Sequence, residues 1–100
     1  MEESQRICFH REEILNMFVE IEYILISLAK IGRYYSVPEN KDDAKYNEET
    51  TKFIDEQGIT ARLSSVRLIL SEKFDSTLGD DDMDELERAC QYIEYWKPPV

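Results

Sequence analysis

The residues of this chain that come closest to a chemical site are the acidic residues of the segment Gly79-Asp80-Asp81-Asp82-Met83-Asp84-Glu85. Carboxylates at alternating positions are typical of the EF-hand calcium loop. Counted from Asp80, the third and fifth positions fit, but Glu85 stands where the loop needs Gly, and Gln91 where it needs Glu. The segment therefore does not predict a calcium site, and we expect no bound metal.

Few other residues suggest catalysis. His10 is the only histidine, so a His-rich zinc site, Glu-x-x-His motifs and a pair of histidines for acid–base catalysis are all missing. Cys8 and Cys90 form no C-x-x-C pair, no feature supplies a base for either thiol, and there is no Gly-rich phosphate loop. We expect two small buried cysteines in a reducing compartment. The sequence favours a protein that is not an enzyme and needs no cofactor.

Net charge is the strongest compositional signal, at −10 for 100 residues. Such a surface repels nucleic acid and anionic membranes, because affinity for phosphate comes from Lys and Arg. We therefore expect a basic protein as the partner. The excess lies in two segments: seven acidic and three basic residues from Glu39 to Gln57, and seven acidic and two basic residues from Gly79 to Val100.

The element expected to organise the chain is a helix over Glu12–Tyr35. One apolar row on it follows steps of four, three, four, three and seven residues: Ile14, Phe18, Ile21, Leu25, Leu28 and Tyr35. A second row comprises Leu15, Val19, Ile26 and Ala29, so we expect other helices to cover this one on more than one side. The uncharged run Tyr23–Ala29 is far shorter than the roughly 20 residues of a membrane span. An acidic N-terminus without a signal pattern favours a cytoplasmic location.

Capping residues, Gly and Pro predict the ends of the first helix and three further helices. Ser4 is a candidate cap for the first helix, which can equally begin near Glu12, and Pro38 ends it before Val37. Asp42 or Asp43 caps a second helix that runs to about Gln57. Gly58 then provides a left-handed stop, or a short break within one longer bent helix. Thr60 is the expected cap of a third helix, which ends near Leu78. Asp82 and Glu85 form a capping box that starts a fourth helix, and Pro98 and Pro99 end it.

These elements predict an all-α fold, an antiparallel bundle of about four helices in a single domain over residues 1–100. The residues expected to share its core are Phe18, Ile21, Leu25, Leu28, Leu63, Val66, Leu70, Leu86, Cys90 and Ile93. In an up-down-up-down bundle, the loops after the first and third helices lie at the same end. We therefore expect one acidic binding face made of Glu39, Asp42, Asp43, Asp80, Asp81, Asp82, Asp84 and Glu85. Tyr95 and Trp96 are candidate contact residues, since Tyr and Trp are enriched at interface hot spots.

The run EKFDSTLGDDDMDELERA and the closing YWKPP, within Thr50–Val100, resemble small bacterial immunity proteins of contact-dependent growth inhibition systems. The resemblance is to those that guard against ribonuclease toxins, RNase A-like ones among them. The resemblance implies an immunity protein and carries over no site residues. The charge of the chain leads to a similar expectation, because an acidic face that docks on the basic active site of a nuclease competes with RNA. The alternatives are a helical interaction or adaptor module, homodimeric through part of the first helix, and a small enzyme.

Overall fold

The computed structural model describes residues 6–99. Its elements are α1 (Arg11–Tyr34), a 3-10 turn η1 (Pro38–Asn40), α2 (Asp43–Glu56), α3 (Ile59–Ser71) and α4 (Glu85–Cys90). There is no strand in this part of the chain, so the predicted all-α class is confirmed. No helix among these residues is long and apolar enough to cross a membrane.

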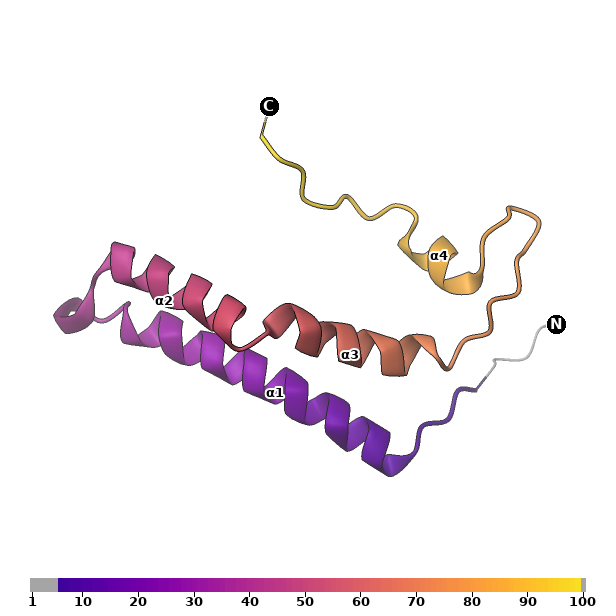
Figure 1. The fold of residues 1–100 in the computed structure, drawn as a ribbon, viewed down its shortest axis with the longest axis horizontal. Coiled ribbons are helices and arrows are strands. Elements are labelled where there is room, and N and C mark those ends of the chain that lie inside the picture. The colour runs from indigo at the N-terminus through magenta and orange to yellow at the C-terminus, as the bar shows by residue number, and fades with distance from the viewer. Residues whose placement is uncertain (1–5, 100) are drawn as a thin grey trace.

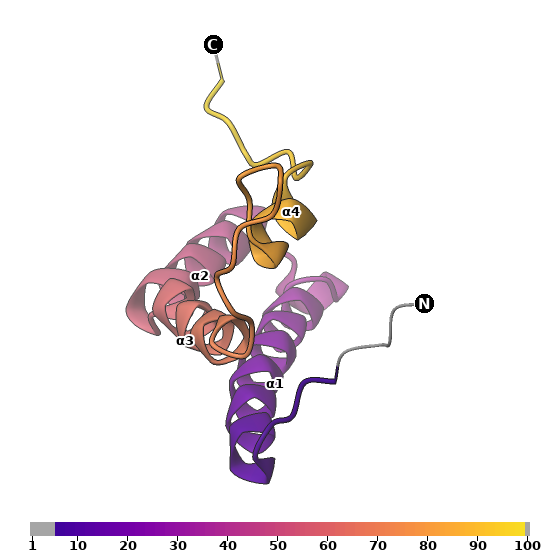
Figure 2. The same ribbon diagram turned by 90° about the vertical axis from the view of Figure 1, so that its right-hand side faces the viewer.

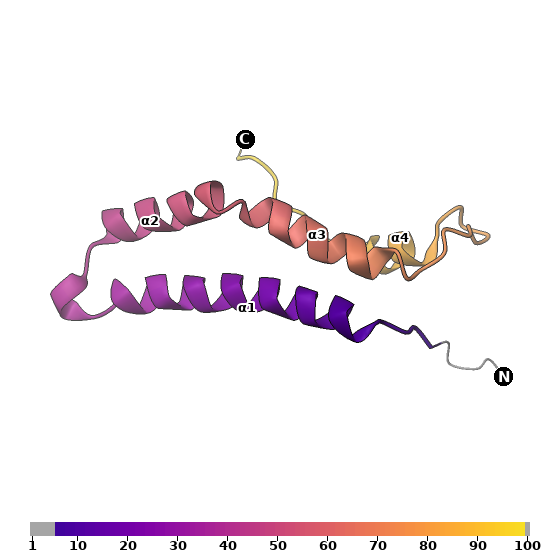
Figure 3. The same cartoon turned by 60° about the horizontal axis from the view of Figure 1, so that its bottom comes forward.

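The body of the molecule is a long helical hairpin. α1 forms one arm, and α2 and α3 follow one another along it as the other arm (Figure 1). Contacts between the arms pair Tyr23 with Gln57, Glu20 with Arg62 and Glu13 with Lys73, so the arms are antiparallel. Figure 3 shows that α2 and α3 meet end to end at a shallow bend. The chain is therefore broken into two helices at Gly58, as the predicted stop requires, but it continues in the same direction and does not turn back.

Gly58 makes the bend. Its φ of 59° and ψ of 45° lie in the left-handed region, which glycine adopts without the clash that a Cβ causes. The predicted left-handed stop is thus confirmed. α3 begins at the next residue, Ile59, so Thr60 does not cap it, and that prediction is wrong.

Some of the remaining helix ends differ from those predicted from the sequence. Asp42 caps α2, as expected, by accepting a hydrogen bond from the Lys45 backbone N–H at 2.9 Å. α1 begins at Arg11, and Ser4 lies outside the described residues. α3 ends at Ser71, well before Leu78. α4 is short: its capping box is Asp84 with Glu87 rather than Asp82 with Glu85, and it stops at Cys90 without reaching the prolines.

The buried core is small and lies along the contact between the two arms. Its most enclosed side chains are Met17 and Ile24 of α1 and Ile59 and Val66 of α3. Carboxylates flank them: Glu20 accepts from Arg62 at 3.1 Å, and Glu13 accepts from Lys73 at 2.7 Å. Arg62 also lies over the Tyr23 ring, 4.5 Å from its centroid. The row of α1 that contacts α3 therefore contains both apolar and acidic side chains, and the acidic ones form ion pairs with basic residues of the other arm.

The predicted core is largely wrong. Of its ten residues only Val66 is buried, Leu86 is half-buried and the others are exposed, Phe18 and Leu25 by nearly three fifths. Cys8 and Cys90 are also exposed as free thiols, contrary to expectation. The physical reason is helix phase: the row that contacts α3 contains Glu13 and Glu20, so the more apolar neighbouring row faces outward.

Aromatic side chains hold α1 and α2 together, one pair near the middle of the hairpin and one pair at its turn. The rings of Tyr23 and Phe53 lie 5.6 Å apart, and those of Tyr35 and Tyr46 lie 6.5 Å apart. Such tilted and edge-to-face pairs are favourable beyond the area they bury. They hold α2 against α1, although α2 has no fully buried residue.

Candidate functional site

The acidic residues predicted as one binding face lie in two groups. Glu39, Asp42 and Asp43 are at the turn between α1 and α2, whereas the segment Asp80–Glu85 follows α3 at the opposite end of the hairpin (Figure 1). The single face is therefore wrong. It required the chain to reverse at Gly58, but α2 and α3 run in the same direction.

The acids at the turn are partly occupied by local structure. Asp42 caps α2, and Asp43 accepts a hydrogen bond from the Lys41 ammonium at 2.9 Å. Glu39 is an exposed residue of η1. Asp42 and Asp43 therefore serve the start of α2 first, and Glu39 makes no such contact within the described residues.

The acids before α4 are organised around Arg88. Its guanidinium donates to both oxygens of Asp81, at 2.8 and 2.9 Å, and to the carbonyl of Met83 at 3.0 Å. The Arg88 hydrogen bonds, followed by one from the Met83 backbone N–H, hold the pKa of Asp81 well below its usual range. Asp84 accepts from the Glu87 N–H as the N-cap. Asp81 and Asp84 are thus structural residues of this loop.

Three carboxylates of the same segment remain available. Within residues 6–99, the side chains of Asp80, Asp82 and Glu85 form no hydrogen bond or ion pair, and all three are exposed. Asp82 has a φ of 60°, a left-handed geometry that Asp and Asn tolerate better than other side chains. The loop built by Arg88 therefore presents three carboxylates within six residues that form no ion pair.

The residues after α4 add exposed aromatic surface. Tyr92, Tyr95 and Trp96 are 87, 68 and 82 % exposed. Tyr92 lies in the turn after α4, and Tyr95 and Trp96 lie in the irregular segment that then leads away from the hairpin (Figure 2). The sequence identified Tyr95 and Trp96 as contact candidates, and the structure adds Tyr92. The sequence feature that could have identified Tyr92 is its position close to Tyr95 and Trp96.

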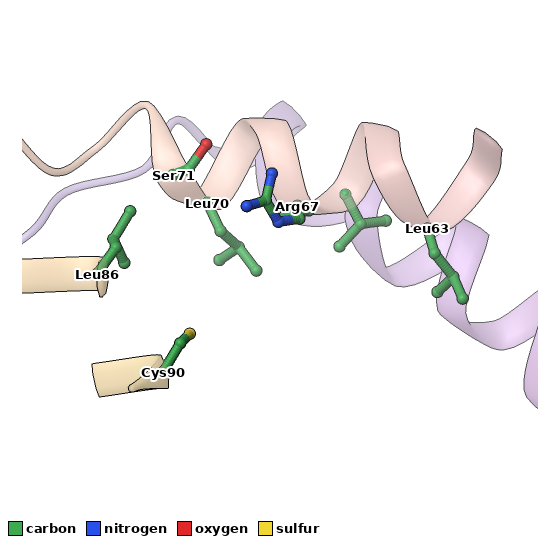
Figure 4. A pocket seen from close by; sticks show the side chains of 7 residues that line it. Leu63, Arg67, Leu70, Ser71, Leu86 and Cys90 are labelled. Carbon is green, nitrogen blue, oxygen red and sulfur yellow. The ribbon is translucent and has the colours of Figure 1, made fainter. Parts of the chain in front are cut away.

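An apolar cavity of about 320 Å³ separates α3 from α4 (Figure 4). Its apolar lining comes from Leu63, Val66 and Leu70 of α3 and from Leu86 and Cys90 of α4, with Arg67 and Ser71 at its border. All five apolar residues were predicted to be core. The cavity shows that α4 rests loosely on α3, so these side chains approach one another without closing a core.

No group of three His, Cys, Asp or Glu side chains in the described part of the chain is arranged to hold a metal ion. Three comparisons with known proteins complete the description of the site. The sequence matches no protein-family model, and neither a search of curated proteins nor one of solved structures finds a match.

Proposed function

We propose that this chain is a non-catalytic binding protein that captures a basic protein through its C-terminal segment, Asp80–Trp96. The observation that carries the proposal is the combination found there. Three carboxylates without a partner and three exposed aromatic rings lie on one short segment that extends from the hairpin. Tyr and Trp supply large contact area, and carboxylates supply attraction to Lys and Arg.

The distribution of charge supports the same segment. Residues 11–71 carry eleven acidic and eight basic side chains, a net charge of −3. Residues 72–100 carry nine acidic and three basic side chains, a net charge of −6 in less than half the length. A basic partner is therefore attracted chiefly to the C-terminal third, and this long-range attraction speeds association at low salt.

The partner class that fits best is a toxin domain with a basic active site, such as a ribonuclease. A ribonuclease binds phosphate through cationic side chains, so an acidic aromatic segment seated there competes with RNA and needs no turnover. The resemblance of Thr50–Val100 to bacterial immunity proteins of contact-dependent growth inhibition covers this same segment. Protection of the cytoplasm of the producing cell is the role that follows.

The hydrogen bonds of the Arg88 loop determine which acidic residues can be substituted to test binding without disturbing the loop. Neutralising Asp81 or Asp84 would disturb the loop itself, so the informative triple variant is Asp80→Asn, Asp82→Asn and Glu85→Gln, in which Asn suits the left-handed φ at position 82. The matched control removes three charges outside this segment, one from η1 and two from the end of α2. Its substitutions are Glu39→Gln, Asp55→Asn and Glu56→Gln.

The experiment has two stages. The tagged chain captures its partner from a lysate of the source cell, and the identified partner is then purified and titrated with each variant at low and high salt. We expect the triple variant to weaken binding at least tenfold at low salt and less at high salt, because salt screens exposed charges. The control should bind like the unmodified chain. Equal affinity of both triple variants would contradict the assignment of this segment, and a partner that is not basic would contradict the proposal as a whole.

A further inference from the structure

The proposed function leaves a regular row of exposed apolar side chains on α1 unused. Five side chains along one row of α1 are between 38 and 59 % exposed: Ile14, Phe18, Ile21, Leu25 and Leu28. They follow steps of four, three, four and three residues, the spacing with which one helix packs against another. A row this regular and this apolar is unusual on a surface in contact with water.

Helix phase extends the row onto the other arm. Glu20 and Arg62 contact one another across the hairpin, and Ile21 and Leu63 are the next residues on their helices. One residue turns a helix by about 100°. Because the arms are antiparallel, this step brings both side chains to the same side of the hairpin. Leu63 is 48 % exposed, and it also lines the cavity beside α4, so α4 borders the apolar row on the α3 side.

The accessible area of the chain exceeds that of a compact protein of its size. A folded monomer of 11.9 kDa exposes about 6,000 Å², whereas this chain exposes 8918 Å². Its radius of gyration is 18.7 Å, against about 13 Å for a compact chain of 100 residues. A standard interface buries about 800 Å² per partner, roughly a quarter of the excess of about 3,000 Å². Part of this excess comes from the irregular segments before α1 and after α3, and the exposed side chains of α1 supply another part, which is available to an interface.

The charge and symmetry of the row point to a second copy of the same chain as its occupant. α1 carries four acidic and three basic residues, so two copies of it hardly repel. The row is also symmetric about Ile21, and an antiparallel copy sets Phe18 opposite Leu25 and Ile14 opposite Leu28. A face without charges is complementary to itself, as an isologous interface requires.

We propose that two hairpins pack their α1 rows against one another, antiparallel, around a twofold axis near Ile21. The product is a four-helix bundle with the two α1 helices at its centre and an acidic C-terminal segment leading away from each hairpin. This inference does not rest on the proposed function, since the row belongs to α1 whereas the acidic and aromatic residues of that proposal lie beyond α3.

The first test is the mass in solution, measured by light scattering or sedimentation over a range of concentrations. We expect about twice 11.9 kDa for the unmodified chain. Leu25→Glu should give the monomer, whereas Val19→Glu should leave the dimer intact. The control is matched, because Leu25 and Val19 are 59 and 60 % exposed on the same helix, but Val19 lies off the row. A monomeric unmodified chain, or equal dissociation of both variants, would overturn the proposal.

The second test does not depend on a destabilising charge. In a Cys8→Ser, Cys90→Ser background, Ile21→Cys should form an inter-chain disulfide under mild oxidation, and Val19→Cys should not. Reversal of this pattern, or no crosslink at Ile21→Cys, would refute the twofold axis. Binding of the basic partner to Leu25→Glu separates the two proposals, because it should persist when the dimer is lost.

Discussion

Ile24→Ala and Leu25→Ala are neighbouring substitutions for which the structure predicts very different costs. Ile24 is 8 % exposed in the contact between α1 and α3, and Leu25 is 59 % exposed on the outer row. Each change removes three carbons, which contribute about 0.8 kcal/mol each when fully buried. Burial alone gives about 2.2 kcal/mol for Ile24 and about 1 kcal/mol for Leu25, with a cavity contribution raising the first to about 3 kcal/mol.

Thermal unfolding followed by circular dichroism measures both costs. In a domain of this size, 1 kcal/mol corresponds to about 4–8 °C in Tm. We therefore expect Ile24→Ala to lower Tm by about 12–24 °C and Leu25→Ala by no more than about 4–8 °C. The chain must be diluted until Tm no longer depends on concentration, because a dimer through the outer row would add to the cost at Leu25. Equal losses at that dilution would show that the assigned helix phase is wrong.

Two further predictions concern the backbone at Gly58 and the ion pair of Asp81. A Cβ at Gly58 meets no neighbouring atom, but the backbone keeps a φ of 59°, so Gly58→Ala should lower the free energy of unfolding by about 1–2 kcal/mol. Gly58→Asn should lower it less. Urea unfolding ranks the two variants, and the opposite order would argue against the left-handed bend. Arg88 holds the pKa of Asp81 below that of the unfolded chain, so the stabilisation of the α4 loop should be complete above about pH 4 and lost as pH falls further. NMR shifts of α4 amides from pH 6 to pH 2 follow the loss, and an unchanged profile in Arg88→Gln would contradict the assigned cause.

The sequence was informative where local chemistry decides the structure. Asp42 as a cap, Gly58 as a left-handed stop and Pro38 after the first helix all act within a few residues. The four helical segments and the all-α class follow from such signals together with helical periodicity. These features needed no knowledge of which segments meet.

The sequence was misleading where distant residues decide. α1 has apolar side chains on nearly every face, so periodicity could not tell which row contacts α3. The choice is made by Glu13 and Glu20, whose basic partners lie 60 and 42 residues away. The single acidic face failed for a related reason, because its two halves meet only if the chain reverses at Gly58.

The reversal of the chain between α1 and α2 also sets an order in which the hairpin can assemble. The contact of Tyr35 with Tyr46 closes a loop of eleven residues, whereas that of Glu13 with Lys73 closes one of sixty. Since closure entropy grows with loop length, the turn end should form first and the hairpin should close outward from it. Opening proceeds in reverse, beginning where Lys73 meets Glu13 and lies over the Phe9 ring. The end of the hairpin that should open first is therefore also the end from which the acidic C-terminal segment leaves it.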